Sequence, residues 1–341
     1  MTRLDCSDGS DLYTTRMSTT LEPVRPIALS EIRAARERIA KTINRTPLVR
    51  LELGPEFPDI RLKLENLQPI NAYKLRGAAN AVAALSEADR KHGVWTISAG
   101  NAGQGVAYAA KAAGVPCTVV VVETAPKSKL ERMKALGAKL IPVPYEIAWN
   151  ALDERSFPGV EGTFIHPFDD DDFIAGHGTI GLEILEDAPD TAAVIASIGG
   201  GGLIAGVASA IKAIKPETKV LGVEPETAAP AALSFKKNSP QVFPNWRPSF
   251  VDGAGGQSMF PRMWERMKPI VDDYLVVTLE QTKNAMRLLA EKARVIAEGA
   301  GALPVAAALS GKAGNGPIVA IISGGNIDLQ KFCELISQSD S

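Results

Sequence analysis

Residues 192–214, AAVIASIGGGGLIAGVASAIKAI, pass from a β-branched segment through four consecutive glycines into an alanine-rich segment. The first part predicts a buried strand that ends at Ile198, and the last part predicts a helix that begins near Leu203. Consecutive unobstructed N–H groups at the start of a helix suit an anion, phosphate above all. A tight turn made only for packing explains one or two glycines, but it explains four poorly. No lysine, serine or threonine follows as in a P-loop, so nucleoside triphosphate hydrolysis is not indicated.

Other segments repeat this strand, turn and helix order. Residues 94–114, VWTISAGNAGQGVAYAAKAAG, and residues 117–143, CTVVVVETAPKSKLERMKALGAKLIPV, form one set, from about residue 91 to 167. A second set contains residues 192–214, the strand KVLGVEPE and the strand PIVAIISGGN near the C-terminus. The pattern predicts an α/β fold with two open, twisted, mainly parallel sheets flanked by helices. Residues 234–262, rich in proline, asparagine and serine, are predicted to form a long irregular connection.

The composition excludes several classes of protein. Hydrophobic residues make up 45% and charged residues 22%, with a formal net charge of -2, so nucleic acid and anionic membranes are not expected partners. Cys6, Cys117 and Cys333 form no close pair, which argues against a disulfide framework or a thiolate zinc site. The first 20 residues contain no apolar signal segment, and no stretch approaches the ~18 apolar residues of a membrane span. A cytoplasmic location is expected.

Lys74 lies among small residues in NAYKLRGAAN, residues 71–80, at the start of a predicted helix. Taken alone, an exposed surface lysine is the commoner explanation. The alternative is an amine in a pocket, with a lowered pKa, that bonds covalently to a carbonyl group. The other motifs must decide between the two.

Two further turns carry polar side chains. SAGNAGQG, residues 98–105, turns from a strand into a helix, and its exposed N–H groups suit a carboxylate, although a simple helix N-cap is the alternative. Ser323 follows the last predicted strand, at the sheet edge where open α/β proteins bind ligands.

One possible function is that of an oxidoreductase that binds a dinucleotide. Gly200, Gly202 and Ala205 satisfy G-x-G-x-x-A, and Glu224 stands about 20 residues downstream, where a ribose-binding acid is expected. Against this, the unit lies deep in the chain and gives Lys74 no role. Another possible function is that of a protein that binds an amino acid and catalyses no reaction.

Six motifs occur in a fixed order: NAYKLRGA, SAGNAGQG, IAGHGT, GGGGLIAG, GVEPE and SGGN. Together they resemble the fold type II pyridoxal-phosphate enzymes, the tryptophan-synthase β-like group, and above all its serine/threonine dehydratase and serine racemase branch. The similarity covers residues 26–335. It implies a flexible extension over residues 1–25, a large cofactor-binding domain of residues 26–90 and 168–335, and a small mobile domain of residues 91–167.

The resemblance implies pyridoxal 5′-phosphate as cofactor and assigns roles to individual residues. Lys74 would hold the cofactor covalently and act in catalysis, Asn101 would contact its 3′-hydroxyl, and Ser323 would face its pyridine nitrogen. The implied cofactor-binding residues are Lys74, Tyr73, Asn101, Gly199, Gly200, Gly201, Gly202, Leu203 and Ser323. The implied substrate-binding residues are Ser98, Ala99, Gly100, Asn101, Ala102 and Gly103.

The implied reaction is a lyase reaction, in which a β-hydroxy-α-amino acid loses water and the unsaturated product is then hydrolysed to a 2-oxo acid and ammonia. Ala102 stands where most of the branch has histidine, which favours a bulky substrate such as 3-phenylserine, converted to phenylpyruvate. A simple exchange for a better helix former is the alternative explanation of this alanine. An L-threonine/L-serine dehydratase is the alternative. Ala99 replaces the second serine of the racemases, so racemisation is expected to be weak or absent.

Other positions depart from the family pattern. His177 replaces the usual glutamine and receives no role. Glu224 and Ala228 match the branch's divalent-cation site only weakly, because Pro230 occupies the place of an aspartate; no metal is predicted. The expected partner is an amino-acid substrate. A homodimer is the candidate assembly, with the oligomeric state left open.

Overall fold

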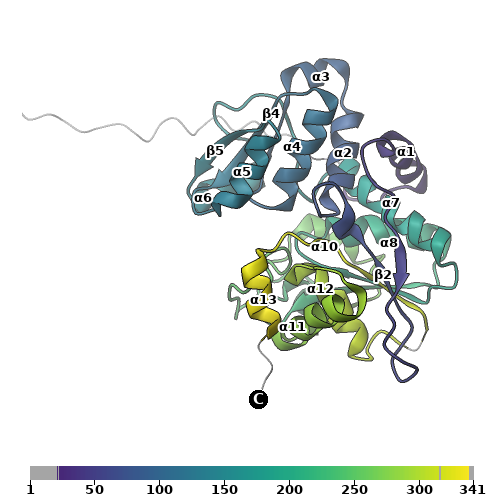
Figure 1. The fold of residues 1–341 in the computed structure, drawn as a ribbon. Coiled ribbons are helices and arrows are strands. Elements are labelled where there is room, and N and C mark those ends of the chain that lie inside the picture. The colour runs from purple at the N-terminus through teal and green to yellow at the C-terminus, as the bar shows by residue number, and fades with distance from the viewer. Residues whose placement is uncertain (1–20, 22, 315, 338–341) are drawn as a thin grey trace, which may run out of the picture.

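The computed structural model describes residue 21 and residues 23–314 and 316–337, so most of the predicted extension over residues 1–25 lies outside the described residues. Figure 1 shows two groups of strands and helices, one above the other. The predicted α/β fold with two mainly parallel sheets is confirmed.

The lower group contains a six-stranded sheet in the order β1, β2, β10, β7, β8, β9. Only β1 runs antiparallel, paired with β2, and the other neighbours are parallel. The strands are β1 (Leu48–Arg50), β2 (Ile60–Lys63), β7 (Ala193–Ser197), β8 (Lys219–Pro225), β9 (Asp273–Val277) and β10 (Ile318–Ile321). The central strands are nearly continuous apolar runs, as expected for a sheet that is covered on both faces.

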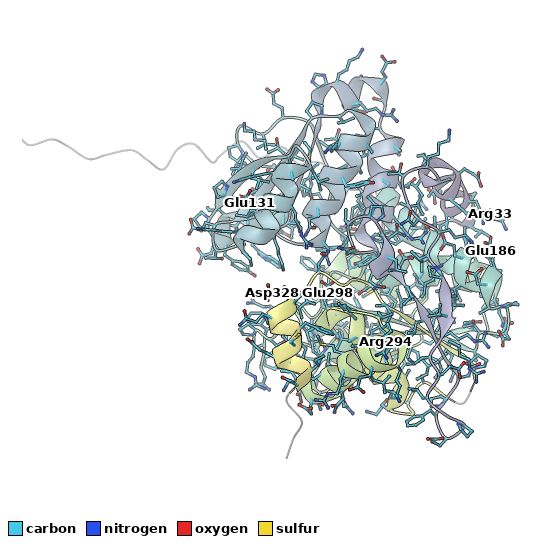
Figure 2. All side chains as sticks on the ribbon, in the orientation of Figure 1. Arg33, Glu131, Glu186, Arg294, Glu298 and Asp328 are labelled. Carbon is cyan, nitrogen blue, oxygen red and sulfur yellow. The ribbon has the colours of Figure 1, made fainter. Side chains whose placement is uncertain are left out.

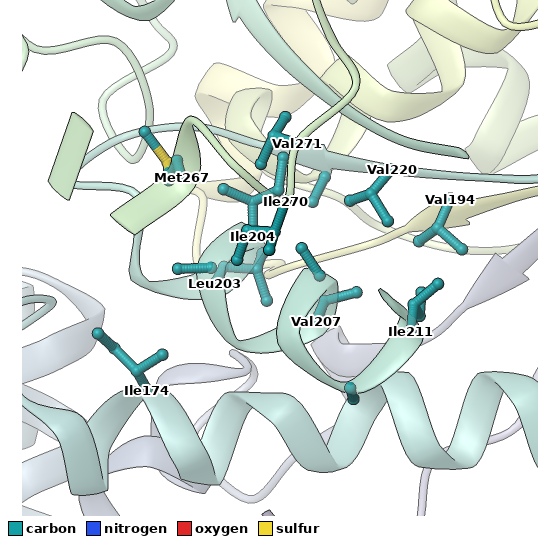
Figure 3. Packing of buried hydrophobic residues seen from close by; sticks show 14 of the residues in the cluster. Ile174, Val194, Leu203, Ile204, Val207, Ile211, Val220, Met267, Ile270 and Val271 are labelled. Carbon is teal, nitrogen blue, oxygen red and sulfur yellow. The ribbon is translucent and has the colours of Figure 1, made fainter. Parts of the chain in front are cut away.

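Successive residues of β7 contribute to two separate cores. Val194 packs toward helix α8 (Gly202–Ile214), whereas Ile195 packs toward helix α12 (Gly299–Leu309). Figure 3 shows the first core, where Val194 and Val220 lie near Val207 and Ile211 of α8. The helices of this face are α1 (Leu29–Ile39), α7 (Asp171–Asp187), α8, α9 (Pro230–Lys237) and α10 (Pro261–Met267). The opposite face carries α11 (Leu279–Leu288), α12 and α13 (Leu329–Ser337).

The upper group contains a parallel four-stranded sheet in the order β5, β4, β3, β6. Its strands are β3 (Val94–Ile97), β4 (Cys117–Val122), β5 (Lys139–Val143) and β6 (Thr163–Phe164). One face packs on α4 (Asn101–Ala113) and α5 (Lys127–Ala135), and the other packs on α6 (Tyr145–Glu154). The short α3 (Glu87–His92) precedes β3. These strands lie inside the predicted domain of residues 91–167, whose boundaries and mobility stay predictions.

Helix α2 (Lys74–Ala84) lies between the two groups and packs against both α4 and α7. The approach to α7 is very close: a Cβ at Gly176 would lie 2.3 Å from the Arg76 main-chain oxygen. On the α2 side, a Cβ at Gly77 would lie 2.6 Å from the Phe173 main-chain oxygen, so glycines on both helices allow this contact.

A buried network of four charged side chains fixes α2 to its neighbours. Arg76 Nε donates to Glu65 Oε2 at 2.8 Å, and Arg76 Nη1 donates to Glu183 Oε1 at 2.7 Å. Lys63 Nζ donates to Glu183 Oε2 at 2.5 Å. Burial would raise the pKa of Glu65, but the Arg76 guanidinium holds it below its usual value. Each buried charge has a partner, as burial requires.

The predicted irregular connection over residues 234–262 is wrong at both ends. Helix α9 (Pro230–Lys237) extends into it and is followed by Asn238, whose φ of 54° leaves the helical region. Helix α10 begins at Pro261, because proline is favoured in the first turn of a helix. Within the part of the chain that the structure describes, no helix is both long and apolar enough to cross a membrane.

Candidate functional site

Lys74 is the first residue of α2 and is only partly exposed. Its Nζ donates a hydrogen bond to the main-chain oxygen of Pro167 at 2.5 Å and lies 5.3 Å from the ring centroids of Tyr73 and Phe173. Burial lowers the pKa of Lys74 to about 7. A lysine of this kind is a substantially neutral amine near neutral pH, as a nucleophile or base must be. The surface alternative for Lys74 is therefore wrong.

The four glycines lie between β7 and α8, and at Gly200 and Gly201 the surroundings or the backbone conformation exclude a side chain. A Cβ at Gly200 would lie 2.2 Å from Phe168 Cγ, and Gly201 has a φ of 88°. Among the described residues, the N–H groups of residues 200–203 have no hydrogen-bond acceptor. The turn thus combines free donors with the positive end of a helix, which fits the phosphate of the implied cofactor.

Phe168 brings the glycine turn and Lys74 to the same place. Its ring lies against Gly200, and its preceding residue, Pro167, accepts the hydrogen bond from Lys74. The segment is held by His166, whose Nδ1 accepts from the N–H groups of Phe168 at 3.3 Å and Asp169 at 2.9 Å. Sequence reasoning missed both His166 and Phe168. The sequence HPFDD, residues 166–170, one residue after β6, is the signal that could have drawn attention to them.

Ser323 also lies beside the start of α2. The Tyr73 N–H donates to the Ser323 main-chain oxygen at 2.9 Å, and Ala72 forms a β-bridge with Gly324. The Ser323 side chain is buried. Burial raises the pKa of Tyr73, so its phenol stays neutral across the physiological range.

The predicted substrate loop divides into an accessible and a buried part. Residues 98–101 are partly exposed, whereas Ala102 and Gly103 are buried within α4. Ser98 Oγ accepts a hydrogen bond from the Gly100 N–H at 3.1 Å, which shapes the turn. The accessible part can contact a ligand directly, and the buried part contributes through packing.

Asn101 connects the loop to a residue that sequence reasoning missed. Its Nδ2 donates to Glu298 Oε1 at 2.8 Å, and its Oδ1 accepts from Asn326 Nδ2 at 2.8 Å. Glu298 is 5% exposed and lies where the two groups of helices meet (Figure 2). Burial, and next the nearby Asp252, raise the pKa of Glu298 to about 8. An isolated acid before the small residues of GAGA, residues 299–302, is the signal that could have found it.

His177 is fully buried next to the lysine site. Its ring centroid lies 4.6 Å from that of Tyr73 and 4.9 Å from that of Phe173. Neither ring nitrogen has a hydrogen-bond partner among the described residues. Burial, and next the charges of Lys74 and Arg76, lower the pKa of His177 well below its usual value. The ring is therefore neutral at physiological pH.

Glu224 lies apart from these residues and has other partners. Its carboxylate accepts hydrogen bonds from the N–H groups of Ala231 at 3.1 Å and Ala232 at 2.8 Å, in the first turn of α9. The Ala228 oxygen is close to Gly255, where a Cβ would lie 2.5 Å away. Across the described ranges, no group of three or more His, Cys, Asp or Glu side chains could hold a metal ion.

The motifs that bring Lys74, the glycine turn and the Asn101 loop together match a known family along most of the chain. The model of the family described as pyridoxal-phosphate dependent enzyme matches residues 39–324. The chain belongs to this family. Its cofactor is therefore pyridoxal phosphate, and the dinucleotide alternative is wrong.

Two curated relatives and one solved structure support the same placement. The chain is 40% identical to the L-threonine ammonia-lyase of Thermotoga maritima over 321 residues, covering 92% of this chain and 79% of the relative. It is 38% identical to the catabolic L-threonine dehydratase of Staphylococcus aureus over 331 residues, covering 94% and 95% of the two chains. The structure of maize serine racemase superposes with a TM-score of 0.82 at 32% identity, covering 92% of this chain and 97% of the other.

Proposed function

We propose that the protein is a pyridoxal-phosphate dependent ammonia-lyase that removes water from a β-hydroxy-α-amino acid, with L-threonine and L-serine as its substrates. The printed names of the two curated relatives support threonine. The observation that carries the proposal is Lys74, an amine whose pKa is lowered to about 7 by burial, placed beside the same segment that packs on the glycine turn.

When bound, the cofactor withdraws electrons from the substrate and acidifies its Cα–H. Lys74 would bond to the cofactor aldehyde and, after the substrate amino group has displaced it, would take that proton as a neutral amine. The free N–H groups of the glycine turn would hold the cofactor phosphate. The accessible part of the loop, residues 98–101, would hold the substrate carboxylate.

Ser323 and Asn101 would contact the cofactor ring. A serine hydroxyl is neutral and cannot keep the pyridine nitrogen protonated as a carboxylate would. Charge is then poorly stored in the ring, which favours rapid loss of the β-hydroxyl over transamination. A serine at position 323 therefore supports an elimination reaction.

A bulky β-hydroxy amino acid such as 3-phenylserine is the second candidate substrate. It rests on Ala102 alone, which lies buried in α4. The names of the curated relatives favour threonine over this candidate.

The test is the release of 2-oxo acid and ammonia from L-threonine, L-serine, 3-phenylserine and 3-hydroxyaspartate, with Lys74→Ala as the control. We expect the highest kcat/KM with L-threonine and no release by the control. A higher kcat/KM with 3-phenylserine would replace threonine by the second candidate. Absence of 2-oxo acid from all four, by protein that has bound the cofactor, would refute the lyase activity.

A further inference from the structure

Asn101 lies in a chain of hydrogen bonds that crosses from α5 of the upper group to the lower group. Arg132 Nη1 donates to Asn326 Oδ1 at 2.7 Å, Asn326 Nδ2 donates to Asn101 Oδ1 at 2.8 Å, and Asn101 Nδ2 donates to Glu298 Oε1 at 2.8 Å. We call these four side chains the Asn101 relay. In Figure 2, Glu131, the neighbour of Arg132, lies in the upper group, while Asp328 and Glu298 lie in the lower group.

The direction of the relay is set by its fixed members. An arginine side chain can only donate, so the Asn326 atom that faces Arg132 must be the carbonyl oxygen. Asn326 Nδ2 also donates to the main-chain oxygen of Ile70 at 2.8 Å, and a main-chain oxygen can only accept. Two independent partners therefore give the Asn326 amide the same orientation.

The orientation of Asn326 determines that of Asn101. Because both hydrogens of Asn326 Nδ2 are used, on Ile70 and on Asn101, the Asn101 atom that faces Asn326 must be its oxygen. Asn101 Nδ2 then faces Glu298 and uses one hydrogen there. One N–H of Asn101 is left for a ligand, and its acceptor oxygen is already engaged.

We propose that Asn326 and Arg132 are positioning residues that hold the Asn101 amide as a hydrogen-bond donor toward the 3′-oxygen of the cofactor. The proposal deepens the proposed function and rests on it for the ligand of Asn101. An Asn101 amide turned the other way would present its oxygen and repel the lone pairs of an ionised 3′-oxygen. Arg132 is the member that connects this orientation to α5.

Arg132 and the main-chain oxygen of Ile70, the two partners that orient the Asn326 amide, are expected to contribute unequally. Asn326 and Asn101 are partly buried, whereas Arg132 is exposed to solvent, where its hydrogen bond is weakened by water. Loss of Arg132 leaves the Ile70 anchor in place. Loss of the Asn326 Nδ2 donor removes both the hydrogen bond to the Ile70 main-chain oxygen and the hydrogen bond to Asn101.

The main experiment measures cofactor affinity in the absence of substrate, by titrating the apo-protein with pyridoxal phosphate. Asn326→Asp keeps the size of the side chain and its attraction to Arg132, but an ionised carboxylate cannot donate to Asn101 or Ile70. We expect its Kd for pyridoxal phosphate to rise by about tenfold, together with a shifted visible absorbance band of the bound cofactor.

Variants of α5 provide the matched control and a rescue. Lys134→Ala removes an exposed ion pair with Glu131 within α5 that involves neither Asn101 nor Glu298. It should leave the Kd and the absorbance band unchanged. Arg132→Ala should raise the Kd by about threefold, and Arg132→Lys, which keeps a cationic donor, should restore it.

The proposal is overturned if folded Asn326→Asp binds the cofactor with the wild-type Kd and band, or if Lys134→Ala weakens binding as much as Asn326→Asp. If Asn326→Asp does not fold, the Arg132 pair decides: an unchanged Kd in Arg132→Ala overturns the proposal. A failure of the proposed function is distinguishable, because the wild type would then bind the cofactor but release no 2-oxo acid.

Discussion

The Nζ of Lys74 and the main-chain oxygen of Pro167 are 2.5 Å apart, which joins the first residue of α2 to the segment that follows β6. The next residue, Phe168, packs against Gly200 of the glycine turn. Lys74, Pro167 and Gly200, which are far apart in the sequence, therefore lie close together at one site.

The rate of cofactor capture by the apo-protein should depend on the protonation of Lys74. Its pKa is lowered to about 7, so the amine becomes neutral as the pH rises through that value. We expect the second-order rate constant for pyridoxal phosphate binding to increase between pH 6 and 8 and then level off. Stopped-flow absorbance measures this rate. A rate that keeps rising to pH 10 would show an ordinary lysine.

Gly200→Ala should disturb both the fold and the glycine turn, because the added Cβ would lie 2.2 Å from the Phe168 ring. Overpacking of this kind costs about 1–3 kcal/mol in the free energy of unfolding. Urea denaturation of Gly200→Ala, Phe168→Ala and the double variant measures the coupling. The loss caused by Gly200→Ala should be smaller in the Phe168→Ala background. Equal losses in the two backgrounds would contradict the contact.

Arg76→Ala should destabilise the protein strongly, because it leaves the buried carboxyl groups of Glu65 and Glu183 without their main partner. Removal of one partner from a buried ion pair costs about 3–5 kcal/mol. The matched control is Arg36→Ala, whose ion pair with Glu186 is exposed and contributes at most about 1 kcal/mol. Chemical denaturation should separate the two variants clearly. Similar losses would mean that the buried network contributes little.

His177→Gln should reduce the sensitivity of the fold to acid. The pKa of His177 in the folded state is well below its usual value of 6.5, so the unfolded chain binds the additional proton as the pH falls. Stability is then lost progressively below pH 6.5, by up to about 2 kcal/mol at pH 5 for this one group. Urea denaturation at pH 7 and pH 5 should show a smaller loss for His177→Gln. The same loss in both proteins would exclude His177 as a source of acid sensitivity.

The sequence predicts those parts of the site that are formed within one short segment of the chain. The strand, turn and helix of residues 192–214 and the position of Lys74 at a helix start are properties of short segments, in which periodicity and glycine content predict the backbone. The last residues of α9 and the first residues of α10 fall inside the predicted irregular connection, because the asparagine and proline that flank these helices also occur in irregular loops.

Long-range partners could not be predicted in this way. Asn101 and Glu298 are 197 residues apart in the sequence, and neither segment contains a pattern that predicts their contact. Arg76 is a charged residue that composition would place at the surface, yet it is fully buried because two distant carboxylates surround it. Such contacts are a property of the tertiary fold.

The central claim is the covalent attachment of the cofactor to Lys74. The direct test is to load the protein with pyridoxal phosphate, reduce it with borohydride, digest it and map the modified peptide by mass spectrometry. The account predicts a phosphopyridoxyl group on Lys74 in the folded wild type. An unmodified Lys74, or modification of a different lysine in a fully folded sample, would contradict the account.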